Sequence, residues 1–178
     1  MAHDDTGDPA GPHEDVEVLV LFILEKFDAL VDLVGSLDDV TANRDLAGLV
    51  PAGIGTNSAV QLLTHVCGML RRWSSTVNLG VPVPRDREAE FSAQMPVAEV
   101  LEIAAHTRRG FLHDVALTDP AAAPAAVPPG RERLWTGSCH GVLLHVFEEI
   151  SQHLGHAEVT RDVLNAGRRP CLPPALGR

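Results

Sequence analysis

The sequence contains no tyrosine and few other aromatic residues, and this scarcity limits the folds that the chain can adopt. Five phenylalanines and two tryptophans accompany a hydrophobic content of 45% over 178 residues. The core must therefore consist mainly of leucine, valine and alanine, which suits packed helices better than a β-sheet. The composition predicts an all-α fold, and the length predicts a single domain.

Basic residues are also scarce, and nearly all of them are arginine. Lys26 is the single lysine, and 14 basic residues face 24 acidic ones, which gives a net charge of -10. Without a dense basic run, the chain is not expected to bind nucleic acid or an anionic membrane. The longest apolar stretch, 16–24, is too short to span a bilayer and contains Glu17. The preference for arginine, with abundant alanine, glycine and proline, is typical of a high-GC bacterium.

Cysteine is the third scarce residue. The three cysteines, at positions 67, 139 and 171, are too few and too widely spaced for a disulfide framework. Cys67 and Cys139 are therefore expected to be buried as small apolar residues; the alternative for Cys139, near the start of the last predicted helix, is a thiol whose pKa the helix terminus lowers. The first sixteen residues are acidic and lack the basic start and apolar stretch of a signal peptide. These features favour a reducing compartment, and we expect a cytoplasmic protein.

Apolar residues recur at helical spacing in four segments, which are separated by links rich in proline, glycine and polar residues. The predicted helices cover about 14–36, 56–78, 96–117 and 136–167, where Thr56, Asn57 or Ser58 can cap the second helix and Thr136 or Ser138 the fourth. No segment shows strand periodicity, so the sequence predicts a four-helix bundle over residues 14–167, with links long enough for crossover connections. An acidic tail at 1–13 and a proline-rich tail at 168–178 are expected to flank the bundle.

The predicted last helix carries a stripe of His145, Glu149, His153 and His156, spaced by four, four and three residues. A helix turns by about 100° per residue, so these side chains fall within a sector of roughly 80° beside the apolar face. Imidazole and carboxylate groups held against an apolar wall lose hydration and need compensation. A divalent metal ion is the usual compensator, so the stripe predicts a metal site.

His65 offers a partner for this site from the second predicted helix, where its neighbours in sequence are mostly apolar. A catalytic zinc ion has about three protein ligands and an open position, and helix bundles build such sites from facing helices. We therefore predict that His65, Glu149 and His153 bind a divalent metal. The alternative is that Glu149 and His153 form a local pair while His65 is a hydrogen-bonded core imidazole.

The other histidines are assigned more weakly. His145 and His156 are candidate catalytic residues that orient the ligands or move a proton; the alternative places them on the ordinary hydrogen-bonded surface of the helix. His106 and His113, on the third predicted helix, are expected to be solvated.

The end of the second predicted helix offers candidates for binding a ligand. Arg71 and Arg72 either pair with a carboxylate substrate or a thiol cofactor, or are solvated charges. Trp73, which follows them, and Trp135, before the last helix, either line a pocket or pack the helix ends.

Several short motifs add a family resemblance. They are Thr-His-Val at 64–66 followed by Trp73, the pair Trp135-Thr136, and Glu-Glu-Ile-Ser-Gln-His-Leu-Gly-His-Ala at 148–157 followed by Arg161-Asp162. Over about residues 14–166 the chain resembles the DinB superfamily of metal-binding four-helix bundles, and within it the group related to mycothiol-dependent maleylpyruvate isomerase.

The resemblance implies a divalent ion held by one histidine from the second helix and two ligands four residues apart on the last helix. Here those residues are His65, Glu149 and His153. Relatives often carry an acidic residue shortly after the second-helix histidine, where this chain has Met69 and Leu70. The isomerase-like proteins have a second, C-terminal domain that this chain lacks, so maleylpyruvate isomerisation itself is not expected.

Together these features predict a metal-dependent enzyme, an S-transferase or isomerase, in which the ion activates a thiol as thiolate or a water as hydroxide. Zinc is the favoured ion, while nickel, iron or manganese also accept these donors. The resemblance and the high-GC composition favour mycothiol, transferred to an electrophilic small molecule, with Arg72 and Trp73 binding the cofactor.

Two other functions remain open at this point. One is metal-assisted hydrolysis with His145 as the proton acceptor. The other is a non-catalytic helical module that the metal stabilises, such as a homodimer or a stress-induced binding protein.

Overall fold

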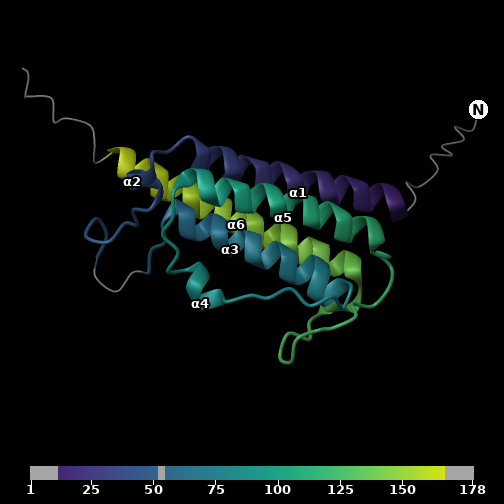
Figure 1. The fold of residues 1–178 in the computed structure, drawn as a ribbon. Helices are drawn as coiled ribbons and strands as arrows, with labels where there is room; N and C mark the ends of the chain where they lie inside the picture. The colour runs from purple at the N-terminus through teal and green to yellow at the C-terminus, as the bar shows by residue number, and fades with distance from the viewer. Residues whose placement is uncertain (1–11, 52–54, 167–178) are drawn as a thin grey trace, which may run out of the picture.

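The computed structural model describes residues 12–51 and 55–166, and its body is a bundle of four long helices (Figure 1). They are α1 (Pro12–Gly35), α3 (Ala59–Arg71) with its π-helical continuation η1 (Arg72–Asn78), α5 (Val97–Leu117) and α6 (Cys139–Ala166). The connections contain α2 (Asp39–Ala42), α4 (Arg87–Glu90) and the 3-10 turn η2 (Leu134–Gly137). The described residues contain no strand, and the predicted all-α bundle is confirmed.

The helix boundaries agree closely with the predicted ones because local signals set them. Ser58 caps α3: its hydroxyl accepts a hydrogen bond from the backbone amide of Gln61, whose side chain accepts one from the amide of Ser58. After η1 the chain turns at Gly80, whose φ of 69° lies in the left-handed region that glycine adopts without strain. The predicted tails lie outside the described residues, except that Pro12 and His13 already belong to α1.

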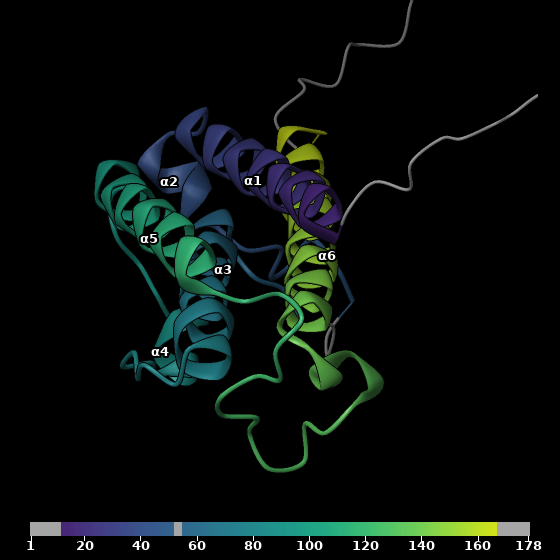
Figure 2. The same ribbon diagram turned by 90° about the vertical axis from the view of Figure 1, so that its right-hand side faces the viewer.

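Around the bundle the helices follow the order α1, α6, α3, α5 (Figure 2). Helices α1 and α6 run in one direction, and α3 and α5 run in the other (Figure 1). Because α3 and α5 are parallel neighbours, the chain must return along the bundle between them, and residues 79–96 make this return. The predicted crossover connection is therefore present, and it lays α4 against α3.

The core is dominated by aliphatic side chains, as the composition predicts. All four long helices contribute to one buried apolar cluster, in which Phe27 of α1 and Phe111 of α5 are fully buried aromatic residues. None of the described helices is long and apolar enough to cross a membrane.

The second long helix differs from the prediction at its end, where residues 72–78 form a π-helix instead of continuing as an α-helix. Two carbonyls of its last turn accept hydrogen bonds from the backbone amides of Ala125 and Ala126, in the link before α6. These contacts attach that link to η1. π-Helical turns are rare and are frequent at functional sites. This one begins with Arg72 and Trp73, the residues predicted to bind a cofactor.

Candidate metal centre

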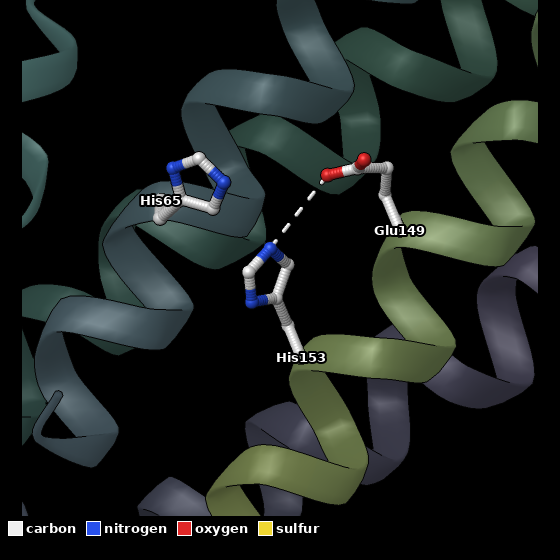
Figure 3. A group of neighbouring side chains, drawn as sticks. All are labelled: His65, Glu149 and His153. Atoms are coloured by element: carbon white, nitrogen blue, oxygen red, sulfur yellow. Dashed lines mark ion pairs between the residues drawn. The ribbon is translucent and has the colours of Figure 1, made fainter. Parts of the chain in front are cut away.

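His65, Glu149 and His153 each bring one donor atom into a group whose members lie within 4.8 Å of one another (Figure 3). His65 comes from α3 and the other two from α6, where Nε2 of His153 lies 3.7 Å from Oε2 of Glu149. The rings of His65 and His153 meet edge to face, with 4.7 Å between their centroids. The three side chains therefore share one small space between two facing helices.

The ring of His65 is oriented by a carboxylate from the crossover connection. Its Nδ1 lies 2.9 Å from Oε2 of Glu90, and both residues are buried. Nδ1 faces this carboxylate and donates to it. The other ring nitrogen, Nε2, points toward Glu149 and His153 (Figure 3). A carboxylate bound to the far nitrogen of a histidine fixes its tautomer and makes the other nitrogen a better metal ligand. Glu90 thus holds His65 in the form that a metal ion requires.

Glu90 is itself held by Arg85, which donates from Nε to Oε1 at 2.6 Å and from Nη2 to Oε2 at 2.8 Å. Burial raises the pKa of the Glu90 carboxyl, but the hydrogen bonds from Arg85 and His65 outweigh it, and the pKa stays below its ordinary value. Gly68 makes room for this pair, because a Cβ atom there would lie 2.0 Å from Oε1 of Glu90. The site therefore includes a buried Arg85-Glu90-His65 chain.

Glu90 and Arg85 were not among the residues predicted for the site. An acidic partner was expected only at 69–70, shortly after His65 on the same helix, whereas the carboxylate comes from 25 residues further along the chain. The one local signal is Asp86, whose side chain accepts hydrogen bonds from two backbone amides and caps α4. This cap could have indicated a short helix, although not the direction of the Glu90 side chain.

Glu149 lies between the histidines one turn before and one turn after it. Nε2 of His145 is 3.8 Å from Oε1, while His153 approaches Oε2. Contact with His153 lowers the pKa of the Glu149 carboxyl; burial opposes this, and positive charge on His145, His153 and His65 lowers the pKa further. With a pKa below the ordinary carboxyl value, Glu149 is ionised at neutral pH and supplies the anionic donor.

His145 is buried between two tryptophans. Its ring stacks on Trp135 with 4.0 Å between centroids and 18° between planes, and it meets Trp73 nearly at right angles at 5.1 Å. Its Nδ1 lies 3.4 Å from Oε2 of Glu148. Trp73 and Trp135 therefore pack against each other and fix the plane of the His145 ring. Both sequence alternatives hold for Trp73, which packs here and also lines a cavity.

The remaining histidines lie further from the centre. His156 is partly buried on α6 but does not join the group of three donors. Burial lowers its pKa, and the charge of His153 acts in the same direction. Its catalytic role stays a prediction. His106 and His113 are exposed on α5, as expected for solvated side chains.

A cavity of about 380 Å³ opens beside the three-donor group. His65, His145 and Glu149 form one part of its wall, and Arg72 and Trp73, the predicted cofactor-binding residues, form another. A volume of this size is sufficient for a small molecule. Two of the three candidate metal donors, His65 and Glu149, are thus accessible to a ligand in the cavity.

Arg71 has a structural role that distinguishes it from Arg72. Its guanidinium binds the buried carboxylate of Asp114 on α5, which also accepts a hydrogen bond of 2.6 Å from the hydroxyl of Ser74. Gly110 provides the space, since a Cβ atom there would lie 2.8 Å from Cζ of Arg71. Arg71 therefore joins α3 to α5 and does not line the cavity.

A family model described as mycothiol-S-transferase matches residues 18–166, a range that contains the whole candidate centre. The chain belongs to the mycothiol-S-transferase family. This is a DinB-like family, so the resemblance seen in the sequence is confirmed. No curated protein and no solved structure matches the chain significantly.

The residues of this mycothiol-S-transferase family member fit a divalent ion. Two imidazole nitrogens and one carboxylate oxygen are common ligands of zinc and related ions. The described part of the chain adds no fourth donor to the group, which matches catalytic zinc sites with three protein ligands. Two neutral imidazoles and one carboxylate leave a divalent ion with a net positive charge.

The two described cysteines, Cys67 and Cys139, are buried, and neither is a reactive thiolate at neutral pH. Burial raises the pKa of Cys67 to about 12. Burial, and to a lesser extent the charge of Asp119, raises the pKa of Cys139.

We expect neither Cys67 nor Cys139 to react with iodoacetamide in the folded protein at neutral pH, and both to react after denaturation. Mass-spectrometric peptide mapping measures this. Labelling of native Cys67 as fast as a small free thiol would contradict it.

Proposed function

We propose that this protein joins mycothiol, through its sulfur atom, to an electrophilic small molecule, with a divalent metal ion held by His65, Glu149 and His153. The observation that carries the proposal is the convergence of these three donors beside a cavity. Membership of the family supports mycothiol as the thiol. In the reaction a carbon–sulfur bond forms, the thiol gives up its proton, and the electrophile releases a leaving group or gains a proton.

Zinc is the ion that we propose, because imidazole and carboxylate donors in a three-ligand set are typical of catalytic zinc; nickel, iron and manganese accept the same donors. When bound, such an ion lowers the pKa of a thiol in its open coordination position. The chain contributes the orientation of the donors. Glu90 holds the tautomer of His65, and the ionised Glu149 balances part of the cationic charge.

His145 is the residue that we assign as proton acceptor. It lies on the cavity wall with its ring fixed between Trp73 and Trp135, and its Nε2 faces Glu149. An imidazole in this position can take the proton that the thiol releases and pass it to solvent. His156, one turn beyond His153, is the second candidate for moving a proton. Arg72 and Trp73 both line the cavity, and Trp73 would form the part of its wall against which mycothiol binds.

Thiol dependence tests the proposal. We expect the zinc-loaded protein to convert an aryl halide such as chlorodinitrobenzene only when mycothiol is added, with the conjugate measured by chromatography. N-acetylcysteinamide keeps the thiol and the neutral amide but lacks the sugar and inositol. It should therefore give a kcat/KM lower by about tenfold or more, because truncated substrates lose remote binding energy.

Two outcomes would contradict this function in different ways. Unchanged turnover of an electrophilic substrate in the absence of thiol would rule out mycothiol transfer and favour metal-assisted hydrolysis. Bound zinc with no effect of mycothiol on any electrophile would favour a non-catalytic module in which the ion stabilises the bundle.

A further inference from the structure

The cavity beside the metal donors has an unusually cationic wall for so acidic a chain. Four arginines, Arg72, Arg85, Arg87 and Arg131, line it, whereas Glu149 is its one acidic residue. The whole chain carries a net charge of -10. The four arginines come from three separate segments, namely η1, the crossover connection and the link before α6. The fold therefore gathers positive charge at this place from distant parts of the sequence.

Three of these arginines have no carboxylate partner within the described part of the chain. Arg85 is neutralised by Glu90, but no ion pair joins Arg72, Arg87 or Arg131 to an acidic residue there. Arg87 instead lies over the ring of Phe91, with Cζ 5.0 Å from the ring centroid.

Two arginines that lie away from the cavity are paired with aspartates. Arg71, directly before Arg72, binds Asp114, and Arg108 forms two hydrogen bonds with Asp28 at 2.9 and 3.0 Å. Arg44, Arg109 and Arg133 are exposed and have no ion pair with a described residue either, but they lie outside the cavity wall, which gathers three unpaired arginines in one place.

Unpaired guanidinium groups in a hollow surface repel one another and concentrate anions. Their planar donor geometry matches a carboxylate, which binds two N–H groups at once. Mycothiol does not meet this need, since its sugar, inositol and N-acetylcysteine parts carry no charged group besides the thiol. The anion must then belong to the other reactant.

We propose that the electrophile of this enzyme carries a carboxylate, which Arg72, Arg87 and Arg131 bind while the electrophilic carbon faces the metal donors. This inference rests on the proposed function and specifies its substrate class. For an aryl chloride with a carboxylate, the sulfur of mycothiol forms a bond to the ring carbon and the carbon–chlorine bond breaks. Chloride leaves with the bonding electron pair, and the thiol proton passes through His145 to solvent.

Binding is the first test, and it uses molecules without a leaving group. Isothermal titration of the zinc-loaded full chain with dinitrobenzoate and with the neutral dinitrobenzamide should show the benzoate binding about tenfold more tightly or better. Each of Arg72→Gln, Arg87→Gln and Arg131→Gln should weaken benzoate binding by about three- to tenfold and leave the amide unchanged. The triple variant should remove the preference. Arg109→Gln, an exposed arginine of α5, is the matched control and should behave like the parent protein.

Turnover is the second test. With mycothiol, the kcat/KM for chlorodinitrobenzoate should exceed that for its amide, after each kcat/KM is divided by the rate constant of the uncatalysed reaction of that compound with mycothiol. The triple variant should remove this advantage.

Equal binding of benzoate and amide would overturn the inference even if mycothiol transfer is observed. Benzoate binding that is insensitive to all three substitutions would overturn it too, because the carboxylate would then be held by the ion alone. Arginine-dependent binding of benzoate without thiol-dependent turnover of any electrophile would support the anion site and overturn the proposed function.

Discussion

Replacing His153 with alanine is expected to abolish stoichiometric metal binding. His153 is one of three donors, its Nε2 faces Glu149 and its ring lies against that of His65. Removing it leaves two protein ligands, too few for a zinc site of either structural or catalytic type. The loss of affinity should exceed the roughly 10–100-fold loss that follows removal of a residue behind a ligand. Elemental analysis of the purified variant and competition with a chromophoric chelator measure it.

His106→Ala is the control for this prediction. His106 is an exposed histidine on α5, so its removal changes the histidine content without touching the three donors. We expect its zinc content to equal that of the parent chain. Equal zinc content in the His153 and His106 variants would show that the ligand assignment is wrong.

Replacing Glu90 with alanine is expected to affect both stability and metal affinity. The side chains of Glu90 and Arg85 are 7% and 13% exposed, so the substitution leaves a largely buried guanidinium without its partner. Breaking such a pair costs about 3–5 kcal/mol, which urea denaturation of the metal-free protein measures. His65 also loses the carboxylate that fixes its tautomer, and zinc affinity should fall by about 10–100-fold.

The matched control is Glu88→Ala, an exposed glutamate on the same short helix, which should change stability by less than about 0.5 kcal/mol.

The pH dependence of the stability of the Glu90 variant gives a second readout. The pKa of Glu90 is lower in the folded chain than in the unfolded one, so its contribution is complete above the ordinary carboxyl range and is lost as pH falls through the lowered pKa. The Glu90 variant should therefore lose less stability on acidification than the parent. Wild-type stability and zinc affinity in this variant would contradict the role of the Arg85-Glu90-His65 chain.

The four long helices could be predicted from the sequence because each buries a continuous apolar face and because caps such as Ser58 act locally. The π-helix at 72–78 could not. Its carbonyls bind the link before α6, and Ser74 within it binds Asp114 on α5. These contacts exist only in the folded bundle, and no local sequence pattern predicts them.

The three metal donors could be predicted because residues four apart on one helix have a fixed relation, and His65 stood out in an apolar segment. His156 is on the same helical face but lies about 4.5 Å further along the axis than His153, which places it outside the donor group. Glu90 could not be predicted, because its contact with His65 depends on the path of the crossover. The cationic cavity wall also escaped prediction, with Arg72 as its one member identified in advance.

The crossover and the link before α6 supply cavity wall residues, while the candidate metal donors lie on the packed helices α3 and α6. This division separates the residues that must be preserved during evolution from the residues that can change. Arg87 and Arg131 can be exchanged without removing a core side chain, whereas Arg85 and Glu90 are constrained by His65. A randomised library confined to the two connections, with that pair kept, would therefore explore new specificities on an unchanged scaffold.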